Sequence, residues 1–401
     1  MRFVFQPPAE TAAGLLDLPW QEPVASWTDP RLIELRNRGL SRHEVRFIAE
    51  GGEVYALKEL DERLARKEYR LLRRLTSLGL PVVEAVGVVV GRPTGDAVLV
   101  TRFLEYSSPY RALFANPRGT HPTERLLDAL VELLVRLHLA GFMWGDCSLS
   151  NTLFRLDAGA FAAYLVDAET AELHPTLSRG QRQYDVEMAH ERIAGELFDL
   201  QAAEMFPGDP VSVANDMVAR YEALWDELTR EEIIQPSEQR FRIAERLRRI
   251  NELGFDVDEV ELVGAGEGVR LKVRTRVAEP GRHRRTLFAR TGLDAQENQA
   301  RRLLNDIASY HGHLERKEGR RVPEVVAADR WLREVYEPVI RAIPPALRDR
   351  LDEVEIFHEI LEHRWFRSEA AGHDVGTTAA TQDYLATVLP TVPQDLTVTP
   401  E

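Results

Sequence analysis

A pair of glycines between two β-rich runs limits the fold of this chain more than any other feature. Residues 44–49 and 53–60 are rich in strand-forming residues and meet at Gly51 and Gly52, which is typical of a β-hairpin. An amphipathic helix is predicted directly after the hairpin, over residues 61–75, because leucines recur there at helical spacing. The N-terminal part of the chain is therefore expected to combine strands with one helix.

More strands and helices are expected further along the chain. β-rich runs follow at residues 82–90 and 97–103, and a long leucine-rich helix is predicted over residues 123–140. Residues 184–229 are expected to be mostly helical, and Pro236 marks a boundary before a second unit of helices and strands. This order of elements predicts an α+β fold class.

The predicted divisions follow from these elements and from the composition of the two ends. The last residues are polar and contain prolines, so they are expected to be disordered. The divisions are an N-terminal extension (1–29), a small β-rich lobe (30–105), a helical lobe (106–233), a smaller C-terminal α+β domain of unknown function (237–390) and a disordered tail (391–401).

Composition excludes several classes of protein. The 401 residues carry a net charge of −14, which opposes non-specific binding to nucleic acid. The single cysteine, Cys147, can form neither an internal disulfide nor a zinc site with several thiolates. No apolar run approaches the roughly 18 residues of a membrane span, and the first residues lack the pattern of a secretory signal. A cytoplasmic protein without a membrane span is expected.

A glutamate on the apolar face of the first predicted helix requires a cationic partner. Glu68 lies four residues after Leu64 and four before Leu72, so these three side chains share one face. An unpaired carboxylate buried there would be strongly destabilising. Lys58, at the end of the preceding strand, is the candidate partner. If the helix is instead offset by one residue, both groups are solvated charges.

An amide and a carboxylate are expected to meet at the end of a second hairpin. The short β-rich runs TLFRL and AAYLV lie on either side of Gly159. If they pair about that glycine, Thr152 lies opposite Val166, and Asn151 lies opposite Asp167. Two such oxygen donors suit Mg²⁺. The alternative is that Asn and Asp stand there because both residue types favour turns.

The order of these residues resembles that of the protein-kinase-like superfamily. A lysine on a strand, a glutamate on the next helix, an Asp-x-x-x-x-Asn loop and an Asp ending the following strand are the parts of such a phosphoryl-transfer site. The stretches that carry the resemblance are VYALK, KEYRLLRRL, LHLAGFMWGDCSLSNTLF and YLVDAE, within residues 30–230. The likeness is closest to aminoglycoside and choline kinases and to the lipopolysaccharide (Kdo) kinases. It implies a bilobal kinase-like fold.

The C-terminal unit resembles an uncharacterised bacterial domain that is found fused to lipopolysaccharide-kinase-like domains. The stretches ENQARRLLNDI and ILEHRWF carry this second likeness. It implies no function.

The kinase resemblance implies an ATP- and Mg²⁺-dependent phosphotransferase and a role for each site residue. Lys58 would hold the α and β phosphates of ATP, and Glu68 would hold Lys58 in position. Asp146 would accept or orient the proton of the acceptor hydroxyl. The metal ligands would be Asn151, Asp167 and, in an Asp-x-Glu pattern, Glu169.

Two loops depart from the family pattern. Trp144 stands where the family usually has histidine, two residues before Asp146. The phosphate-covering loop is expected in RNRGLSRH, where Gly39 stands alone in place of three glycines, so that backbone amides around Ser41 would approach a phosphate. No Ala-Pro-Glu follows Asp167, which argues against a protein substrate. The expected acceptor is a hydroxyl of a small molecule or glycan.

A cationic strand in the second unit predicts a partner of opposite charge. Arg270, Lys272, Arg274 and Arg276 occupy alternate positions and therefore share one face. They are suited to nucleic acid, to a phosphorylated ligand or to an acidic protein surface, or they form a solvated face answered by nearby acids. An alternative function follows, in which a pseudokinase-type module binds nucleotide without turnover and this strand binds RNA or an acidic protein.

Overall fold

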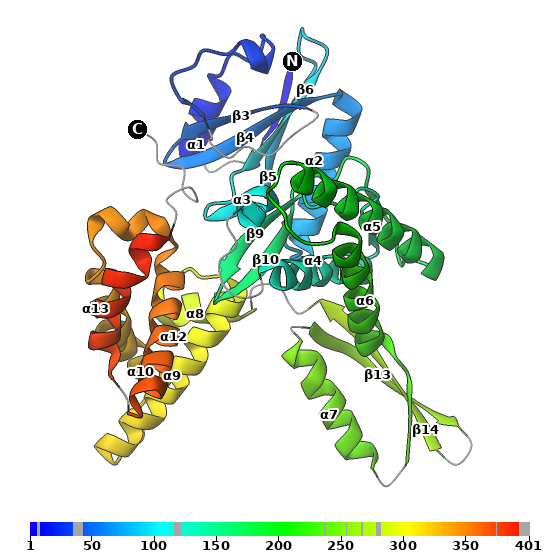
Figure 1. Ribbon diagram of the computed structural model, residues 1–401. Helices are drawn as coiled ribbons and strands as arrows, with labels where there is room; N and C mark the ends of the chain where they lie inside the picture. Colours follow the sequence, from blue (N-terminus) through cyan, green and yellow to red (C-terminus); the bar gives the residue numbers. More distant parts are fainter. Residues whose placement is uncertain are drawn as a thin grey trace.

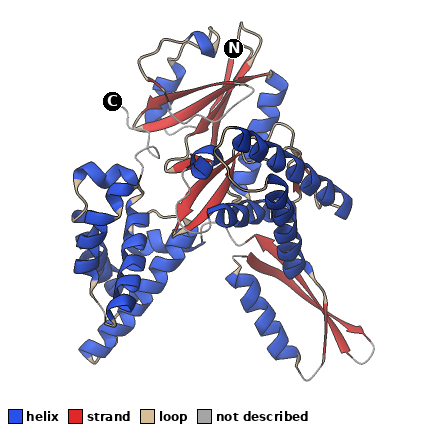
Figure 2. Cartoon of the chain, viewed as in Figure 1, coloured by secondary structure: helices blue, strands red, loops and turns tan. Residues whose placement is uncertain are grey.

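The structure is a computed structural model that describes residues 1–5, 9–34, 43–115, 122–235, 238–253, 255–265, 268–277, 282–373 and 375–392. It has the predicted α+β fold, with a β-sheet lobe at the top of the view and a helical lobe below it (Figures 1 and 2). The predicted disordered tail lies outside the described residues from residue 393 onward.

The first lobe is built on a six-stranded antiparallel sheet. Its strands are β1 (Arg2–Phe5), β2 (Leu32–Ile33), β3 (Glu44–Glu50), β4 (Glu53–Leu60), β5 (Ala85–Val90) and β6 (Ala97–Arg102), in the order β1-β5-β6-β4-β3-β2. The predicted hairpin is confirmed as β3 and β4. Gly51 and Gly52 both have positive φ angles, of 62° and 81°, as a two-residue turn of this hand requires.

Both faces of this sheet are covered. Helix α2 (Glu62–Ser77) lies on one face, where its buried residues Leu72 and Leu75 join the main apolar cluster. Asp61 caps the start of α2 by accepting the backbone N–H groups of Arg63 and Leu64. Strand β5 is buried along its whole length, because it has packing partners on both sides.

The N-terminal segment covers the opposite face. Its helix α1 (Ala9–Leu16) and a short 3₁₀ helix (Val24–Ser26) precede β2, and β1 pairs with β5. Trp20 and Trp27 are buried against the sheet, and the indole N–H of Trp20 donates to the Leu15 carbonyl at 2.8 Å. The described residues of the predicted N-terminal extension (1–5 and 9–29) are thus packed against the sheet.

The second lobe is mostly helical, with short strands beside the site. Its elements are β7 (Ser107–Pro109), α3 (Tyr110–Ala115), α4 (Pro122–Leu139), β8 (Phe142–Met143), β9 (Thr152–Asp157), β10 (Ala160–Leu165), β11 (Glu172–Leu173), α5 (Arg179–Ala202) and α6 (Pro210–Thr229). The end of β10 also joins the two lobes, because the Val83 N–H donates to the Leu165 carbonyl at 3.0 Å.

The predicted register of the second hairpin is wrong by one residue. Thr152 lies opposite Leu165, and the Asn151 carbonyl accepts the N–H of Val166 at 3.0 Å. The cause is the turn, in which Ala158 and Gly159 both have positive φ angles, of 57° and 74°. A two-residue turn therefore replaces the expected turn centred on Gly159. The left-handed conformation of a non-glycine residue costs roughly 1–2 kcal/mol, so it needs compensating contacts.

The C-terminal part of the chain packs as two units. Its first elements are β12 (Glu232–Ile234), α7 (Gln239–Glu252), β13 (Phe255–Ala265) and β14 (Gly268–Val277), and their buried residues join the cluster of the helical lobe. The remaining elements are α8 (Arg282–Thr291), α9 (Glu297–Glu318), α10 (Glu324–Trp331), a π-helix (Leu332–Tyr336), α11 (Glu337–Arg341), 3₁₀ helices (Pro345–Arg350 and Leu389–Thr391), α12 (Glu353–Ala371) and α13 (Thr377–Thr387). They form a separate apolar cluster. The predicted domain boundaries stay a prediction.

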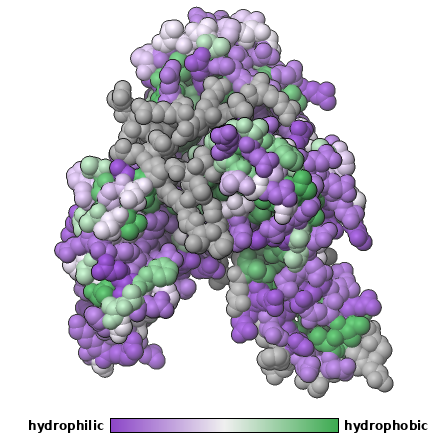
Figure 3. Space-filling view, viewed as in Figure 1, coloured by the Kyte–Doolittle hydropathy of each residue, from purple (hydrophilic) through white to green (hydrophobic). Residues whose placement is uncertain are grey.

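Most of the visible surface is hydrophilic (Figure 3). A hydrophobic area lies near the end of the β13–β14 arm, where Val260, Leu262 and Val263 are exposed. Among the described residues, no helix is both long enough and apolar enough to cross a membrane.

Trp20→Ala should lower the free energy of unfolding by about 3–5 kcal/mol, because it removes a buried indole from the cover of the sheet. Urea unfolding measures the change. Gln21→Ala is the matched control, since Gln21 is the exposed neighbour, and should change stability by less than about 0.5 kcal/mol. A loss below about 1 kcal/mol for Trp20→Ala would mean that the segment does not stabilise the lobe.

Candidate active site

The ammonium group of Lys58 is shared by carboxylates from two other segments. Lys58 lies on β4, and its Nζ is 3.1 Å from Glu68 Oε2 on α2 and 2.6 Å from Asp167 Oδ2 just after β10. Glu169 Oε2 lies 3.7 Å from the same nitrogen. The predicted Lys58–Glu68 pair is therefore present, and the structure brings both together with Asp167 and Glu169.

Burial dominates the electrostatics of this group. Burial and then the charge of Asp167 raise the pKa of Glu68 to about 7, although Lys58 acts in the opposite direction. For Lys58, burial by itself lowers the pKa, but the charges of Glu68 and Asp167 outweigh it and leave the pKa above its ordinary value. Three carboxylates thus surround one ammonium group, and the site has an excess of negative charge.

This excess fits a divalent cation. One oxygen each from Glu68, Asp167 and Glu169 lie within 4.8 Å of one another. Carboxylate oxygens are ligands that Mg²⁺ prefers. Of the predicted ligands, Asp167 and Glu169 belong to this group, and Asn151 lies on the neighbouring loop.

Asp146 and Asn151 face each other across the loop between β8 and β9. The Asn151 side-chain N–H donates to the Asp146 carbonyl at 3.0 Å and to its Oδ2 at 3.2 Å, which leaves the amide oxygen as the acceptor atom of Asn151. Arg192 on α5 reaches Asp146 Oδ1 at 3.0 Å. The described contacts of the Asn151 amide therefore go to Asp146, and the predicted pairing opposite Asp167 is wrong because of the hairpin register.

Two carboxylates of α5 hold the backbone of this loop. Asp185 accepts the N–H groups of Trp144 and Gly145, both at 2.7 Å. Glu196 accepts those of Leu149 and Ser150 at 2.7 and 3.0 Å. Because the two acids are eleven residues apart, about three helical turns, they lie on the same face of α5.

Asp185, near the start of a segment that the sequence predicts as helical, could cap that helix or hold the loop of Asp146, and its contacts show the second role. The cap of α5 is Ser178, within a capping box, and Asp185 is fully buried seven residues later. It also bonds to Nε2 of His138 at 3.0 Å, while Nδ1 of that histidine lies 2.6 Å from the Tyr221 hydroxyl. Burial lowers the pKa of His138 against the influence of Asp185. A neutral ring that donates to Asp185 and accepts from Tyr221 satisfies all three groups. His138 is thus structural.

Glu196 was missed by the sequence analysis. The available signal was its spacing from Asp185 among the apolar residues that α5 buries, since an acid on an apolar face must have partners.

Trp144 links the loop to the carboxylate group. Its ring is completely buried, and its indole N–H donates to the backbone carbonyl of Asp167 at 2.9 Å. Its own carbonyl accepts the Thr170 hydroxyl at 3.0 Å. Where the family usually has histidine, this tryptophan therefore supplies a ring N–H that holds the segment of the predicted metal ligands.

The predicted phosphate-loop residues Gly39 and Ser41 lie outside the described residues. The described part of that loop is its last residue, His43, whose Nε2 is 2.8 Å from Glu169 Oε2. The Glu169 carbonyl also accepts the ammonium group of Lys67 at 2.8 Å. The end of the loop is thus close to the carboxylate group.

The cationic strand faces acids within its own sheet. Arg270 and Lys272 are exposed, and each lies within 4 Å of Glu231, at 3.8 and 3.7 Å. In the register of β13 and β14, Glu261 stands opposite Lys272. Opposite residues of an antiparallel pair share a face, so this part of the face has mixed charge. For Arg270 and Lys272 the structure therefore matches the alternative of a solvated strand face with acids nearby.

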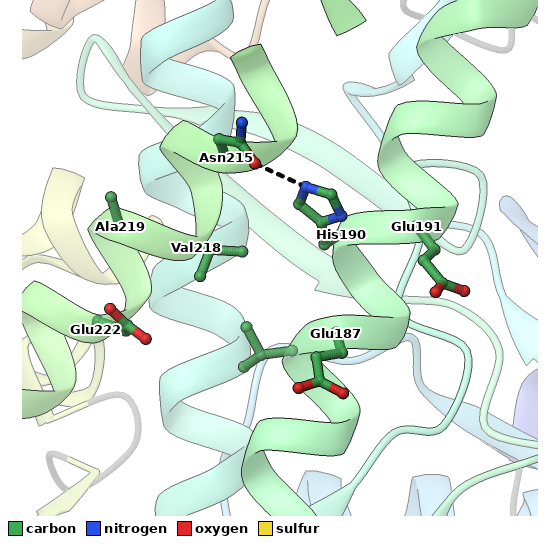
Figure 4. Close-up of a pocket in the computed structure, with 8 residues that line it drawn as sticks. Glu187, His190, Glu191, Asn215, Val218, Ala219 and Glu222 are labelled. Atoms are coloured by element: carbon green, nitrogen blue, oxygen red, sulfur yellow. Dashed lines mark hydrogen bonds between the residues drawn. The ribbon is translucent and has the colours of Figure 1, made fainter. Parts of the chain in front are cut away.

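A hollow of about 460 Å³ lies between α5 and α6 (Figure 4). Its lining residues are Val186, Glu187, His190, Glu191, Asn215, Val218, Ala219 and Glu222. His190 bonds to Asn215 at 2.9 Å. None of the predicted site residues lines it, so it is separate from the Lys58 group.

Two family models match the chain. Residues 52–202 match the lipopolysaccharide kinase (Kdo/WaaP) family, and residues 223–389 match a domain of unknown function, DUF4032. A solved structure titled "WaaP in complex with acyl carrier protein" aligns over 63% of this chain and 99% of that chain, with 19% identity and a TM-score of 0.37. No match was found among curated proteins.

The family match shows that residues 52–202 resemble kinases of the lipopolysaccharide class. Residues 52–202 are similar to the lipopolysaccharide kinase (Kdo/WaaP) family, and residues 223–389 are similar to the domain of unknown function. Both resemblances predicted from the sequence are confirmed.

Cys147 should not react with a thiol reagent while the chain is folded. The side chain is completely buried, and burial raises the pKa of its thiol well above the ordinary value. Titration with dithiobis(nitrobenzoic acid) should release thiolate only after denaturation. Rapid reaction of the native chain would contradict the burial of this loop.

Proposed function

We propose that the protein is an ATP- and Mg²⁺-dependent phosphotransferase that acts on a hydroxyl of a small molecule or glycan. The observation that carries the proposal is the Lys58 ammonium group held between Glu68 and Asp167, beside the Asp146–Asn151 loop. The family match of residues 52–202 supports a kinase-like phosphotransferase. The protein would act in the cytoplasm, as the sequence predicts.

Each residue has a part in the proposed transfer. Lys58 would bind the α and β phosphates, and Glu68 would keep it extended. The acceptor oxygen would attack the γ phosphorus, the bond to ADP would break, and the hydroxyl proton would pass to Asp146. The products are ADP, the phosphorylated acceptor and the proton.

Magnesium would neutralise charge on the transferring phosphoryl group. Asp167, Glu169 and the amide oxygen of Asn151 are the residues that would hold it. The contacts of Trp144 and Asp185 would keep these ligands and Asp146 in fixed positions. Gly39 and Ser41 are proposed to approach the phosphates through backbone amides.

The acid contacts of Arg270 and Lys272 favour a solvated strand face over a binding surface. A nucleic-acid or acidic partner there remains only the sequence-based hypothesis, and so does the pseudokinase alternative.

ATP with Mg²⁺, at about a hundred times its Kd, should stabilise the wild type by about 2.7 kcal/mol. Asp167→Asn should abolish the part of this stabilisation that depends on Mg²⁺, because it removes a charged ligand of the metal. Asp96→Asn, in the exposed turn between β5 and β6, is the matched control and should behave as wild type. Thermal melting of the wild type and of both variants with ATP, with and without Mg²⁺, measures the stabilisation. No shift in the wild type would contradict the proposed ATP site.

Asp146→Asn should lower kcat about 10²–10⁴-fold, because the amide cannot accept the hydroxyl proton. It should leave the ATP-dependent melting shift nearly intact. Release of ADP is measured with candidate acceptors and, in their absence, with water as the acceptor. Unchanged turnover in Asp146→Asn would exclude this residue as the catalytic base.

A further inference from the structure

A carboxylate of the C-terminal helices holds the turn of the β9–β10 hairpin. Glu355 on α12 accepts the N–H of Ala158 at 2.8 Å and that of Gly159 at 2.7 Å. It also accepts the side-chain N–H of Gln299 at 2.7 Å. Glu355 is 1% exposed, and Ala158 and Gln299 are completely buried.

The hairpin in return caps a helix of the same unit. Asp157 accepts the N–H groups of Asn298 and Gln299 at the start of α9, at 3.2 and 2.8 Å. Burial raises the pKa of Asp157 to about 6. Helix α9 begins beside β9 in Figure 1. The hairpin and the C-terminal helices are therefore joined in both directions by carboxylates that accept backbone N–H groups of the other unit.

The contacts of Glu355 compensate for backbone strain in the turn. Ala158 has the left-handed conformation that residues with a side chain rarely adopt. Because Ala158 adopts this conformation, the turn has two residues, and the N–H of Val166 donates to the carbonyl of Asn151. Turn type and length set the register of a hairpin, together with the buried Phe154 and Leu165. The position of Asn151 relative to Asp167 thus depends on this turn.

We infer that the C-terminal helices position the metal-binding end of the hairpin, with Glu355 as the positioning residue. This role rests on the proposed function, in which Asn151 and Asp167 hold magnesium. Glu355 touches neither residue and acts through the turn, at the other end of the two strands.

Glu355→Gln tests this role with little change of shape. All three partners of Glu355 are donors, and a glutamine can accept only through its oxygen. Its NH₂ group must therefore face a backbone N–H or the amide of Gln299. Glu353→Gln is the matched control, because Glu353 is exposed on the first turn of the same helix.

Hydrogen exchange in the full chain gives the readout that does not depend on activity. Glu355→Gln should accelerate exchange in residues 144–151 and 160–166 as well as at the turn, and Glu353→Gln should not. Acceleration confined to residues 157–159 and to the start of α9 would overturn the inference, because the contact would then be only local.

Kinetics give the second readout. Glu355→Gln should raise the Mg²⁺ concentration for half-maximal turnover about tenfold, a typical effect for a group that supports metal ligands. Adding Ala158→Gly should restore much of this loss, because glycine adopts the left-handed conformation without strain. A simple loss of stability would lower Tm without this change in Mg²⁺ dependence. Unchanged Mg²⁺ dependence in Glu355→Gln would overturn the inference.

The two proposals fail in different ways. If the wild type has no transferase or ATPase activity, the proposed function fails, and the exchange experiment alone decides whether Glu355 positions the hairpin. If the wild type is active and Glu355→Gln matches Glu353→Gln in both readouts, the positioning role fails and the proposed function stands.

Discussion

The buried carboxylate of Glu68 is the constraint on which the site depends. It is completely inaccessible to solvent, and a charge in that environment is tolerated only with good partners. Its partners are the Lys58 ammonium group and the N–H of Ala168, at 3.3 Å from Oε1. The first is in the sheet and the second follows β10, so this one side chain joins α2, β4 and the second lobe. The negative charge that remains around Lys58 is what a divalent cation would offset.

In the second lobe, carboxylates that accept N–H groups also hold the loop of Asp146 and Asn151. The buried Asp185 and the half-buried Glu196 are acids of α5 that accept backbone N–H groups at the two ends of the loop. Trp144 then connects this loop to the carbonyl of Asp167. Rigid support of this kind is expected around groups that must hold a metal and a proton acceptor in fixed geometry. At the far end of the hairpin, Glu355 extends the support into the C-terminal helices.

Local patterns in the sequence were sufficient for much of this architecture. The glycine pair identified the β3–β4 hairpin, and the position of Glu68 among leucines identified its pairing with Lys58. What the sequence did not reveal depends on contacts between distant segments. The register of the second hairpin follows from a left-handed alanine that a carboxylate 197 residues away stabilises. The role of Asp185 likewise depends on partners that lie some 40 residues earlier. Contacts between such distant segments leave no periodic pattern in the local sequence.

Calorimetric titration of the full chain with ATP, with and without Mg²⁺, tests the central claim most directly when it is carried out on the wild type and on Lys58→Met. The methionine keeps most of the length of the side chain and removes the charge that the phosphates require. If the Lys58 group is the nucleotide site, binding is Mg²⁺-dependent in the wild type and lost or strongly weakened in the variant. Equal binding by both chains, or no binding by the wild type, would contradict it.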